Sequence, residues 1–218
     1  ALAAVNFLAP YWRTYQCEQI GAFYGKQPGY YGANGGYFDA SGTAPGRWIQ
    51  PWYPLLSGLN NVIFWYTVER IPGDLEINPL RIGIWLDQAN TIKGGLGRQV
   101  ATARMRKDPV AILYSQSSGF ASQYEKKIAE IGNSRLSFNA IFHDLGIQYH
   151  YISSRHLLEG MLEKEAIRLL VLPYCQALGK AETDVIRAFV AGGGTVLADL
   201  RPAVMTENCR PLAPGGLD

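Results

Sequence analysis

The sequence predicts an open α/β fold with a doubly wound parallel sheet in the second half of the chain. Strand-length segments occur at residues 110–115, 148–153, 169–174 and 195–200, and all but the second are largely apolar. A helical pattern separates each run from the next, and glycines close two of these helices. Strands that are buried on both faces lack polar alternation, and strand–helix alternation with right-handed crossovers builds a doubly wound sheet.

The first half of the chain has a different composition. Residues 11–66 are crowded with aromatic side chains and glycines, as in the segment YYGANGGYFDASGTAPGRW, which we interpret as an ordered loop. Residues 52–59 have a helical spacing of large side chains, and residues 62–68 form an unbroken apolar run. A helix, a Gly/Asn turn and a wholly apolar strand predict one αβ unit of a parallel sheet.

The middle of the chain, residues 69–107, is expected to connect two domains. It contains Pro72-Gly73 and then a helical pattern over residues 84–105, with glycines at 94, 95 and 97 and basic residues near its end. Cations suit the negative end of a helix dipole. We interpret this stretch as a solvated linker helix between a domain of residues 1–100 and a domain of residues 101–218.

The helices of the second half follow from apolar spacing. Helical patterns cover residues 121–131, 136–145, 157–165 and 180–191. The second helix carries Leu136, Ala140, Ile141 and Leu145 on one stripe and ends at Gly146, a residue type suited to the left-handed cap. The last helix is expected to face the core with Ala181, Val185 and Phe189.

Composition excludes several classes of function. A net charge of +2 gives no broad field for attracting nucleic acid or an acidic membrane. The apolar runs are of strand length, so no membrane span is expected. Three scattered cysteines suit neither a disulfide framework nor a zinc site, so we expect a cytoplasmic protein. Residue 1 is not Met and both ends interrupt a pattern, so we expect a piece of a longer protein.

Ligands of open parallel sheets bind beyond the carboxyl ends of the strands. The segment SQSSG at residues 115–119 lacks the phosphate-loop pattern and its Lys, so we interpret it as a helix cap. Cys175 has no strand–turn–helix elbow and no neighbouring base, and Asp199 is expected to cap a turn. The three histidines lack ligand spacing. We therefore expect no metal and no cofactor.

The aromatic segment is a candidate site for a carbohydrate. Aromatic faces stack on the apolar faces of sugar rings, and Trp48, Trp52 and Trp65 are the substrate-binding candidates. Burial in the core is the alternative for each ring, because Trp buries a large area. Glu18 and Glu69 are the carboxylates near predicted strand ends, with a solvated surface position as their alternative.

Three segments resemble a known family. Residues 108–121, DPVAILYSQSSGFA, and residues 169–212, which include LLVLPYC and AFVAGGGTVLADL, resemble the trimerisation domain of glycoside hydrolase family 42 β-galactosidases. Residues 47–68 resemble the last helix and eighth strand of that family's (β/α)₈ barrel. The resemblance implies a flavodoxin or class I glutamine-amidotransferase-like domain, preceded by the C-terminal part of a TIM barrel.

The resemblance also implies a mechanism. In such enzymes a Glu acid/base follows the fourth barrel strand and a Glu nucleophile ends the seventh, and a retaining hydrolase needs both. The region of the fourth strand is absent from this sequence. Glu18 is the nucleophile candidate by order, and Ala22 or Phe23 is the alternative occupant of that position.

These observations predict a piece of a β-galactosidase-like hydrolase that is inactive alone. The complete enzyme is expected to act on a carbohydrate. The chain is expected to self-associate, and the resemblance implies a trimer. A non-catalytic assembly or sugar-binding module is the alternative. A free-standing binder of the flavodoxin type is the third hypothesis, and the missing phosphate loop disfavours it.

Overall fold

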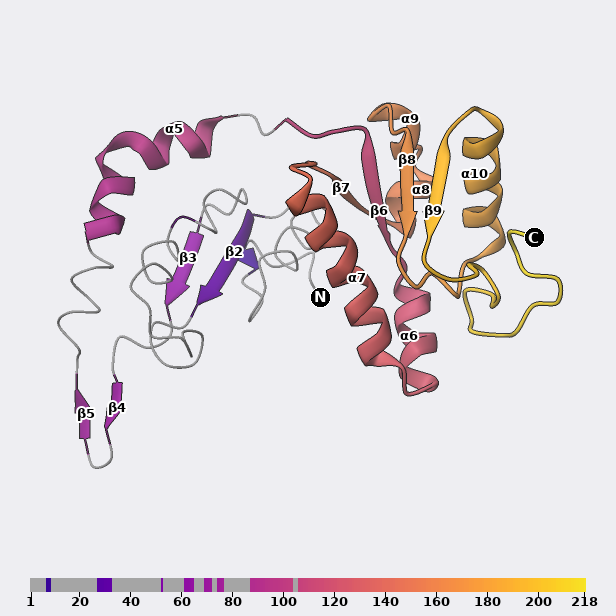
Figure 1. Cartoon of the computed structure of the whole chain (residues 1–218), viewed down its shortest axis with the longest axis horizontal. Coiled ribbons are helices and arrows are strands. Elements are labelled where there is room, and N and C mark those ends of the chain that lie inside the picture. The colour runs from indigo at the N-terminus through magenta and orange to yellow at the C-terminus, as the bar shows by residue number, and fades with distance from the viewer. Residues whose placement is uncertain are drawn as a thin grey trace. The chain divides into compact units, whose positions relative to one another are not determined.

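The computed structural model describes residues 7–8, 27–32, 52, 61–64, 69–71, 74–76, 87–103 and 106–218 (Figure 1). The chain divides into two compact units, residues 1–105 and residues 106–218. Each unit is described by itself below.

The first unit contains a three-stranded parallel sheet. Its strands are β1 (Phe7–Leu8), β2 (Gln27–Gly32) and β3 (Asn61–Phe64), which lie side by side in chain order. In the β2–β3 pair Tyr30 lies opposite Val62. Strand β3 covers the first part of the run predicted at residues 62–68, and residues 65–68 lie outside the described residues. The separate strands β4 (Glu69–Ile71) and β5 (Asp74–Glu76) pair antiparallel.

A helical segment closes the described part of the first unit. Residues 87–91 are α-helical, η2 (Ile92–Leu96) is π-helical, and α5 (Gly97–Thr102) is α-helical again (Figure 1). A helix was predicted over residues 84–105, and it is present with a kink at its glycines. The cause of the kink is Gly95, whose φ of 131° is not helical.

The second unit is built on a four-stranded parallel sheet in the order β7-β6-β8-β9. Its strands are β6 (Val110–Tyr114), β7 (His150–Ser153), β8 (Leu169–Leu172) and β9 (Thr195–Ala198). All three neighbouring pairs are parallel, so the predicted α/β class and the four strands are confirmed. The central strands are buried along almost their whole length. Residues of β9 alternate between exposed and half-buried positions, because that strand lies at an edge of the sheet.

The helices between β6 and β7 differ from the prediction. Helix α6 (Gln116–Tyr124) begins five residues before the predicted start at residue 121 and ends before Lys126, which has a φ of 61°. Helix α7 (Ile128–Asp144) then runs without interruption through the predicted gap at residues 132–135. The prediction was wrong here because a left-handed turn at a Lys carries no Gly or Asn signal.

The apolar stripe predicted for α7 is also wrong. Ile141 is 50% exposed and Leu145 is 66% exposed, while Ile131 and Phe142 are buried. The Phe142 ring lies 5.5 Å from the ring of Tyr149, which in turn lies 5.2 Å from that of Tyr151. Aromatic rings bury more area than the aliphatic stripe, so this ladder decides which face of α7 meets the sheet.

The remaining helices are α8 (Ser154–Leu158), α9 (Met161–Lys164) and α10 (Lys180–Ala191). One helix was predicted over residues 157–165, but Gly160 in the left-handed conformation separates α8 from α9. Helix α10 has the predicted bounds, but its buried face is rotated from the predicted one. Ala181 was expected to face the core and is exposed, whereas Ile186 is only 2% exposed. Val185 and Phe189 pack against the core as predicted, each partly buried.

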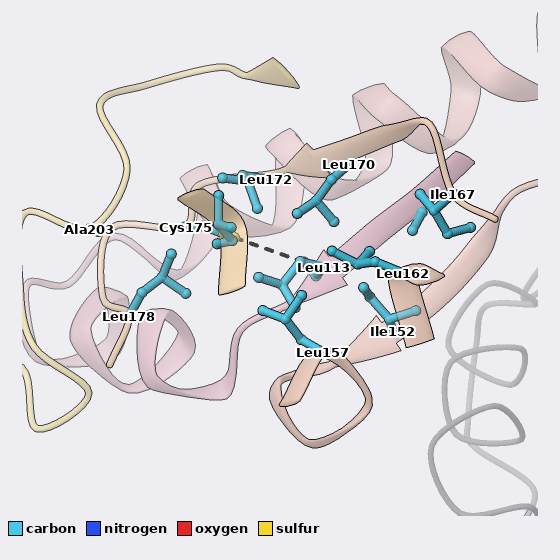
Figure 2. Close-up of a cluster of buried hydrophobic side chains, with 12 residues drawn as sticks. Leu113, Ile152, Leu157, Leu162, Ile167, Leu170, Leu172, Cys175, Leu178 and Ala203 are labelled. Atoms are coloured by element: carbon cyan, nitrogen blue, oxygen red, sulfur yellow. Dashed lines mark hydrogen bonds between the residues drawn. The ribbon is translucent and has the colours of Figure 1, made fainter. Parts of the chain in front are cut away.

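The core of the second unit lies on one face of this sheet (Figure 2). Alternate residues of the central strands enter it, including Ala111 and Leu113 from β6 and Leu170 and Leu172 from β8. Strand β7 adds Ile152, and the helices α8 to α10 and the loops beside β8 and β9 supply the rest: Leu157, Leu162, Ile167, Cys175, Leu178, Ile186 and Ala203. This cluster fixes the carboxyl ends of β6 and β8 relative to each other.

Across the described ranges, we find no helix with both the length and the apolar character needed to cross a membrane.

Candidate functional site

The substrate-binding candidates belong to the first unit. Glu18, Trp48 and Trp65 lie outside the described residues, as do the alternatives Ala22 and Phe23. Trp52 is half-buried and helical, and its indole Nε1–H donates to Gln88 Oε1 at 2.9 Å. The polar atom of Trp52 is therefore used within the protein, which leaves the ring faces as its means of contacting a sugar.

The carboxyl edge of the second sheet is the other place where a ligand is expected. Ser115 follows β6 there and is the N-cap of α6, because its hydroxyl accepts from the Ser118 N–H at 3.1 Å. The same hydroxyl donates to the carbonyl of Ala177 at 2.9 Å. The interpretation of SQSSG as a helix cap is confirmed, with an additional bond to the segment that follows β8.

That segment, residues 175–178, fills the edge of the sheet. The Ser118 hydroxyl donates to the Ala177 carbonyl at 3.0 Å and accepts from the Ala177 N–H at 3.0 Å. Gln176 is buried, and its amide donates to Ser122 at 3.3 Å and to Glu125 at 3.1 Å. Helix α6 thus binds both backbone groups of Ala177 and one buried side chain.

The other side of residues 175–178 is also bonded to the chain. The Ala203 N–H donates to the Cys175 carbonyl at 2.9 Å, and the Met205 N–H donates to the Gln176 carbonyl at 2.9 Å. The Leu178 N–H donates to the Met205 carbonyl at 3.1 Å. Polypeptide therefore occupies the position where open α/β sheets place a phosphate or a nucleotide.

Cys175 lies inside this segment and is 1% exposed. Burial raises the pKa of its thiol to about 12, and the nearby positive charge of Arg135 offsets only part of that effect. Its sulfur lies 3.6 Å from the Pro173 carbonyl oxygen and 3.9 Å from that of Leu113. A nucleophilic cysteine needs a lowered pKa and access to a substrate, and Cys175 has neither.

Asp199 follows β9 and holds the turn that leads into Cys175. Its Oδ1 accepts from the Tyr174 N–H at 2.9 Å, and its Oδ2 accepts from the Ser134 hydroxyl. Tyr174 has a φ of 49°, which costs free energy for a residue with a Cβ. The predicted turn-capping role is confirmed, because the carboxylate bonds the strained residue directly.

Sequence reasoning missed Arg135. Its guanidinium lies 4.1 Å from the centroid of the Tyr114 ring, and its Nη2 donates to the Ser115 carbonyl at 3.1 Å. The residue ties α7 to the end of β6. It was missed because residues 132–135 were assigned to a gap between helices, whereas they lie within α7.

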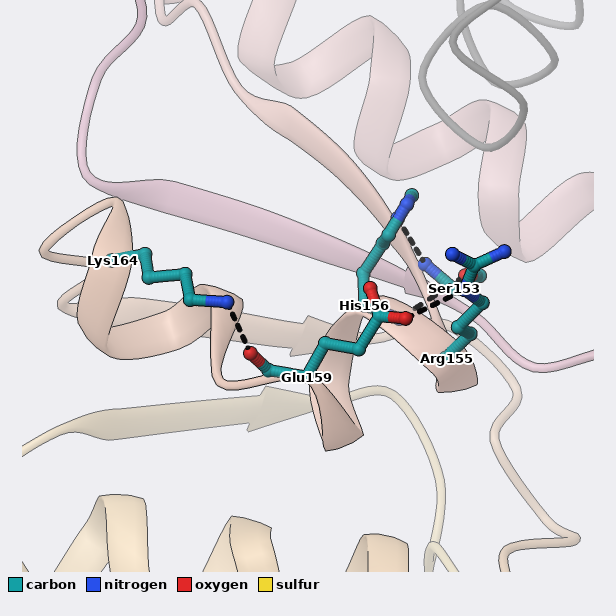
Figure 3. Close-up of polar contacts among 5 residues, drawn as sticks. All are labelled: Ser153, Arg155, His156, Glu159 and Lys164. Atoms are coloured by element: carbon teal, nitrogen blue, oxygen red, sulfur yellow. Dashed lines mark hydrogen bonds and ion pairs between the residues drawn. The ribbon is translucent and has the colours of Figure 1, made fainter.

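One of the three histidines, His156, has a structural role. His156 and Ser153 form the capping box of α8: the Ser153 N–H donates to the imidazole Nδ1, and the Ser153 hydroxyl accepts from the His156 N–H, both at 3.4 Å (Figure 3). Glu159 binds Arg155 at 2.7 Å, and its carbonyl accepts from Lys164 (Figure 3). Within the described ranges, no three His, Cys, Asp or Glu side chains are grouped so as to hold a metal ion.

Comparisons with known proteins give structural relatives only. No family model matches the chain, and no curated protein matches it. A GH42 exo-carrageenase from Bacteroides ovatus matches with a TM-score of 0.58 and 16% identity, over 84% of this chain and 26% of that one. A GH42 β-galactosidase from G. stearothermophilus matches with a TM-score of 0.58 and 15% identity, over 94% of this chain and 34% of that one.

The chain thus spans about a third or less of the length of these two enzymes. At such identity the likeness concerns the fold, and a GH42-like fold agrees with the resemblance drawn from residues 47–68, 108–121 and 169–212.

Proposed function

We propose that this chain is part of a β-galactosidase-like glycoside hydrolase. It comprises the end of the catalytic (β/α)₈ barrel, residues 1–100, and an amidotransferase-like domain, residues 101–218. The observation that carries the proposal is the likeness to a GH42 β-galactosidase over 94% of the chain, which extends through both units.

Strand order in the first unit supports the barrel assignment. In a (β/α)₈ barrel each strand pairs in parallel with the next strand along the chain. Strands β1, β2 and β3 pair in that order and direction. The second unit differs, because its order β7-β6-β8-β9 contains a reversal after the first two strands.

Strand order in the second unit supports a doubly wound, flavodoxin-like domain. The order β7-β6-β8-β9 places the first strand inside and the second at an edge, as in flavodoxin. Right-handed crossovers then put α6 and α7 on one face and α8 to α10 on the other. In agreement, α6 contacts α7, and α8 contacts both α9 and α10.

The second domain is assigned a supporting role. Its carboxyl edge is filled by residues 175–178, and its buried Cys175 has a raised pKa. We assign it to subunit association and to walling the active site of the barrel. Several large apolar side chains are exposed on it, and contact with another surface would bury them: Phe120, Tyr124, Ile128, Ile141, Leu145, Leu158, Val190 and Leu197.

Association is testable by light scattering of the purified chain at micromolar concentration. We expect a mass above that of one chain, with a trimer as the expected assembly. A clean monomer would remove association from the proposal.

The proposed substrate is a β-galactoside-like carbohydrate that stacks on Trp48, Trp52 and Trp65. Retaining hydrolysis needs one carboxyl group to protonate the leaving oxygen and a second, about 5–5.5 Å away, to attack the anomeric carbon. Glu18 is the nucleophile candidate. The acid/base residue has to come from the part of the enzyme beyond this chain.

The gene upstream of Ala1 tests the proposal. We expect it to encode an Asn-Glu pair at the end of a strand, and we expect the full-length product to hydrolyse a chromogenic β-galactoside. Replacing that Glu by Gln should abolish the hydrolysis. The alternative is a non-catalytic assembly or sugar-binding module, and the filled edge of the second sheet is compatible with it. A full-length product that lacks the Asn-Glu pair and binds galactose without hydrolysing galactosides would favour this alternative.

A further inference from the structure

The helix before the unit boundary contains an irregular turn that none of the roles above explains. Within Ile92–Leu96 the hydrogen bonding is π-helical, and the Gly97 N–H donates to the carbonyl of Ile92. Gly95 has a φ of 131° and a ψ of −30°, so two helical arms meet at a kink. π-turns often mark functional places in a helix.

The three glycines of this turn have different surroundings. A Cβ on Gly97 would lie 2.5 Å from the Ile92 Cγ2, so the kinked turn requires glycine there. Gly95 requires glycine because of its positive φ. A Cβ on Gly94 would have no atom within 4 Å, and Gly94 has no positive φ.

The two arms of the helix also differ. Gln88 in the first arm accepts the hydrogen bond of Trp52, which fastens this arm within the first unit. In the second arm Arg98, Gln99 and Thr102 are exposed. The boundary between the units follows shortly after, at residues 105 and 106.

We propose that residues 92–97 are a hinge between the two units. Glycine adopts both positive and helical φ without a steric penalty from Cβ, so Gly95 allows the kinked and the straight form of the helix to interconvert. Any other L-residue at position 95 disfavours the kinked form, because its Cβ makes this positive φ strained. A rotation at this turn would carry α5 (Gly97–Thr102) and the chain that follows it, which leads into the second unit.

Distances between paired spin labels test the hinge in the full chain. Asp87 and Thr102 are exposed and carry one label each after substitution by Cys, with Cys17 and Cys209 replaced by Ser. Fifteen residues of straight helix span about 22 Å. We expect a shorter, broad distribution with Gly95 present and a longer, single distance in Gly95→Ala. Gly94→Ala, the same change one residue earlier, should match the unchanged chain.

A second pair, at Asp87 and Arg187, reports on movement between the units. We expect a broad distribution in the unchanged chain and in Gly94→Ala, and a narrower one in Gly95→Ala. A single narrow distance in the unchanged chain would overturn the proposal without reference to any variant. So would a Gly95→Ala variant that straightens the helix but leaves the inter-unit distribution broad, because the joint would then lie elsewhere.

Discussion

Two buried hydroxyl groups, those of Ser115 and Ser118, explain at the residue scale why the edge of the second sheet holds polypeptide. Both donate to the same carbonyl, that of Ala177, and Ser118 also accepts from the Ala177 N–H. Buried backbone groups need partners. Serine at these two positions therefore stabilises a closed edge, whereas glycines there would leave room for an anion.

Ser118→Ala should destabilise the second unit. The change leaves the Ala177 N–H without its partner in a buried place, at a cost of about 1–3 kcal/mol. Urea denaturation followed by circular dichroism measures the difference. Ser117→Ala is the matched control, because its hydroxyl makes no bond among the described residues and the change lies in the same helix turn. Equal stability of the two variants would contradict the role given to Ser118.

Cys175 should resist alkylation while the protein is folded. Burial raises the pKa of its thiol to about 12, so at pH 8 the folded protein holds this thiol in its unreactive, protonated form. Iodoacetamide labelling followed by peptide mass spectrometry should find Cys209 modified and Cys175 unmodified, and both modified in guanidinium chloride. Fast modification of Cys175 in the folded protein would revive it as a nucleophile candidate.

Acid should destabilise the second unit through His150. Burial lowers the pKa of His150, the charge of Lys107 lowers it further, and that of Glu165 raises it. The unfolded chain therefore binds a proton near pH 6.5 while the folded chain does not. Stability is full above that pH and falls as the pH drops through the lowered value.

Denaturation midpoints at pH 7.5 and pH 5 measure this loss, and His150→Gln should reduce it. The control is His143→Gln, which changes an exposed side chain. An unchanged pH dependence in His150→Gln would assign the acid sensitivity to other groups.

At the scale of elements, the strands were predictable and the helix faces were not. Apolar runs identified β6, β8 and β9, because burial on both faces removes polar alternation, and the strand–helix alternation placed β7 between them. The inward face of a helix depends on its neighbours. In α7 the rings of Tyr149 and Tyr151 select Phe142, although Ile141 and Leu145 form the clearer stripe in the sequence.

The same reasoning applies to helix boundaries and to the site. Lys126 has a positive φ without a glycine signal, so the turn that it forms was missed. The closed carboxyl edge was only partly predictable. SQSSG indicated a cap, but its bonds to Ala177 connect residues that are 59 and 62 positions apart in the sequence, and no local pattern predicts such contacts. The assignments of Glu18, Trp48 and Trp65 remain predictions, because these residues lie outside the described ranges.

The corrected face of α10 is open to a direct test. Ile186 is 2% exposed, so Ile186→Ala should cost about 2–5 kcal/mol through lost burial and a cavity. Val190→Ala is the control in the same helix, since Val190 is 49% exposed and should contribute little. Chemical denaturation of both variants gives the comparison. A larger loss from Val190→Ala would mean that the helix is rotated from the face described above.

At the scale of the whole molecule, we propose a chain of two parts. The first is a partial barrel, and the second is a domain that has no catalytic centre among its described residues. Under the proposed function, the three parallel strands in chain order belong to the barrel, and the order β7-β6-β8-β9 belongs to the doubly wound domain. Under this account the chemistry belongs to the barrel, and the second domain supports it. We propose that hydrolysis requires a second carboxyl group from outside this chain.

Turnover of a chromogenic β-galactoside by the isolated chain tests that claim most directly. With one carboxyl group of the catalytic pair missing, the double displacement cannot proceed, and we expect a rate equal to that of buffer alone. The Glu18→Gln variant, measured in parallel, should give the same rate as the unchanged chain. Hydrolysis above the buffer rate that Glu18→Gln abolishes would contradict the account, because a complete pair would then lie within these 218 residues.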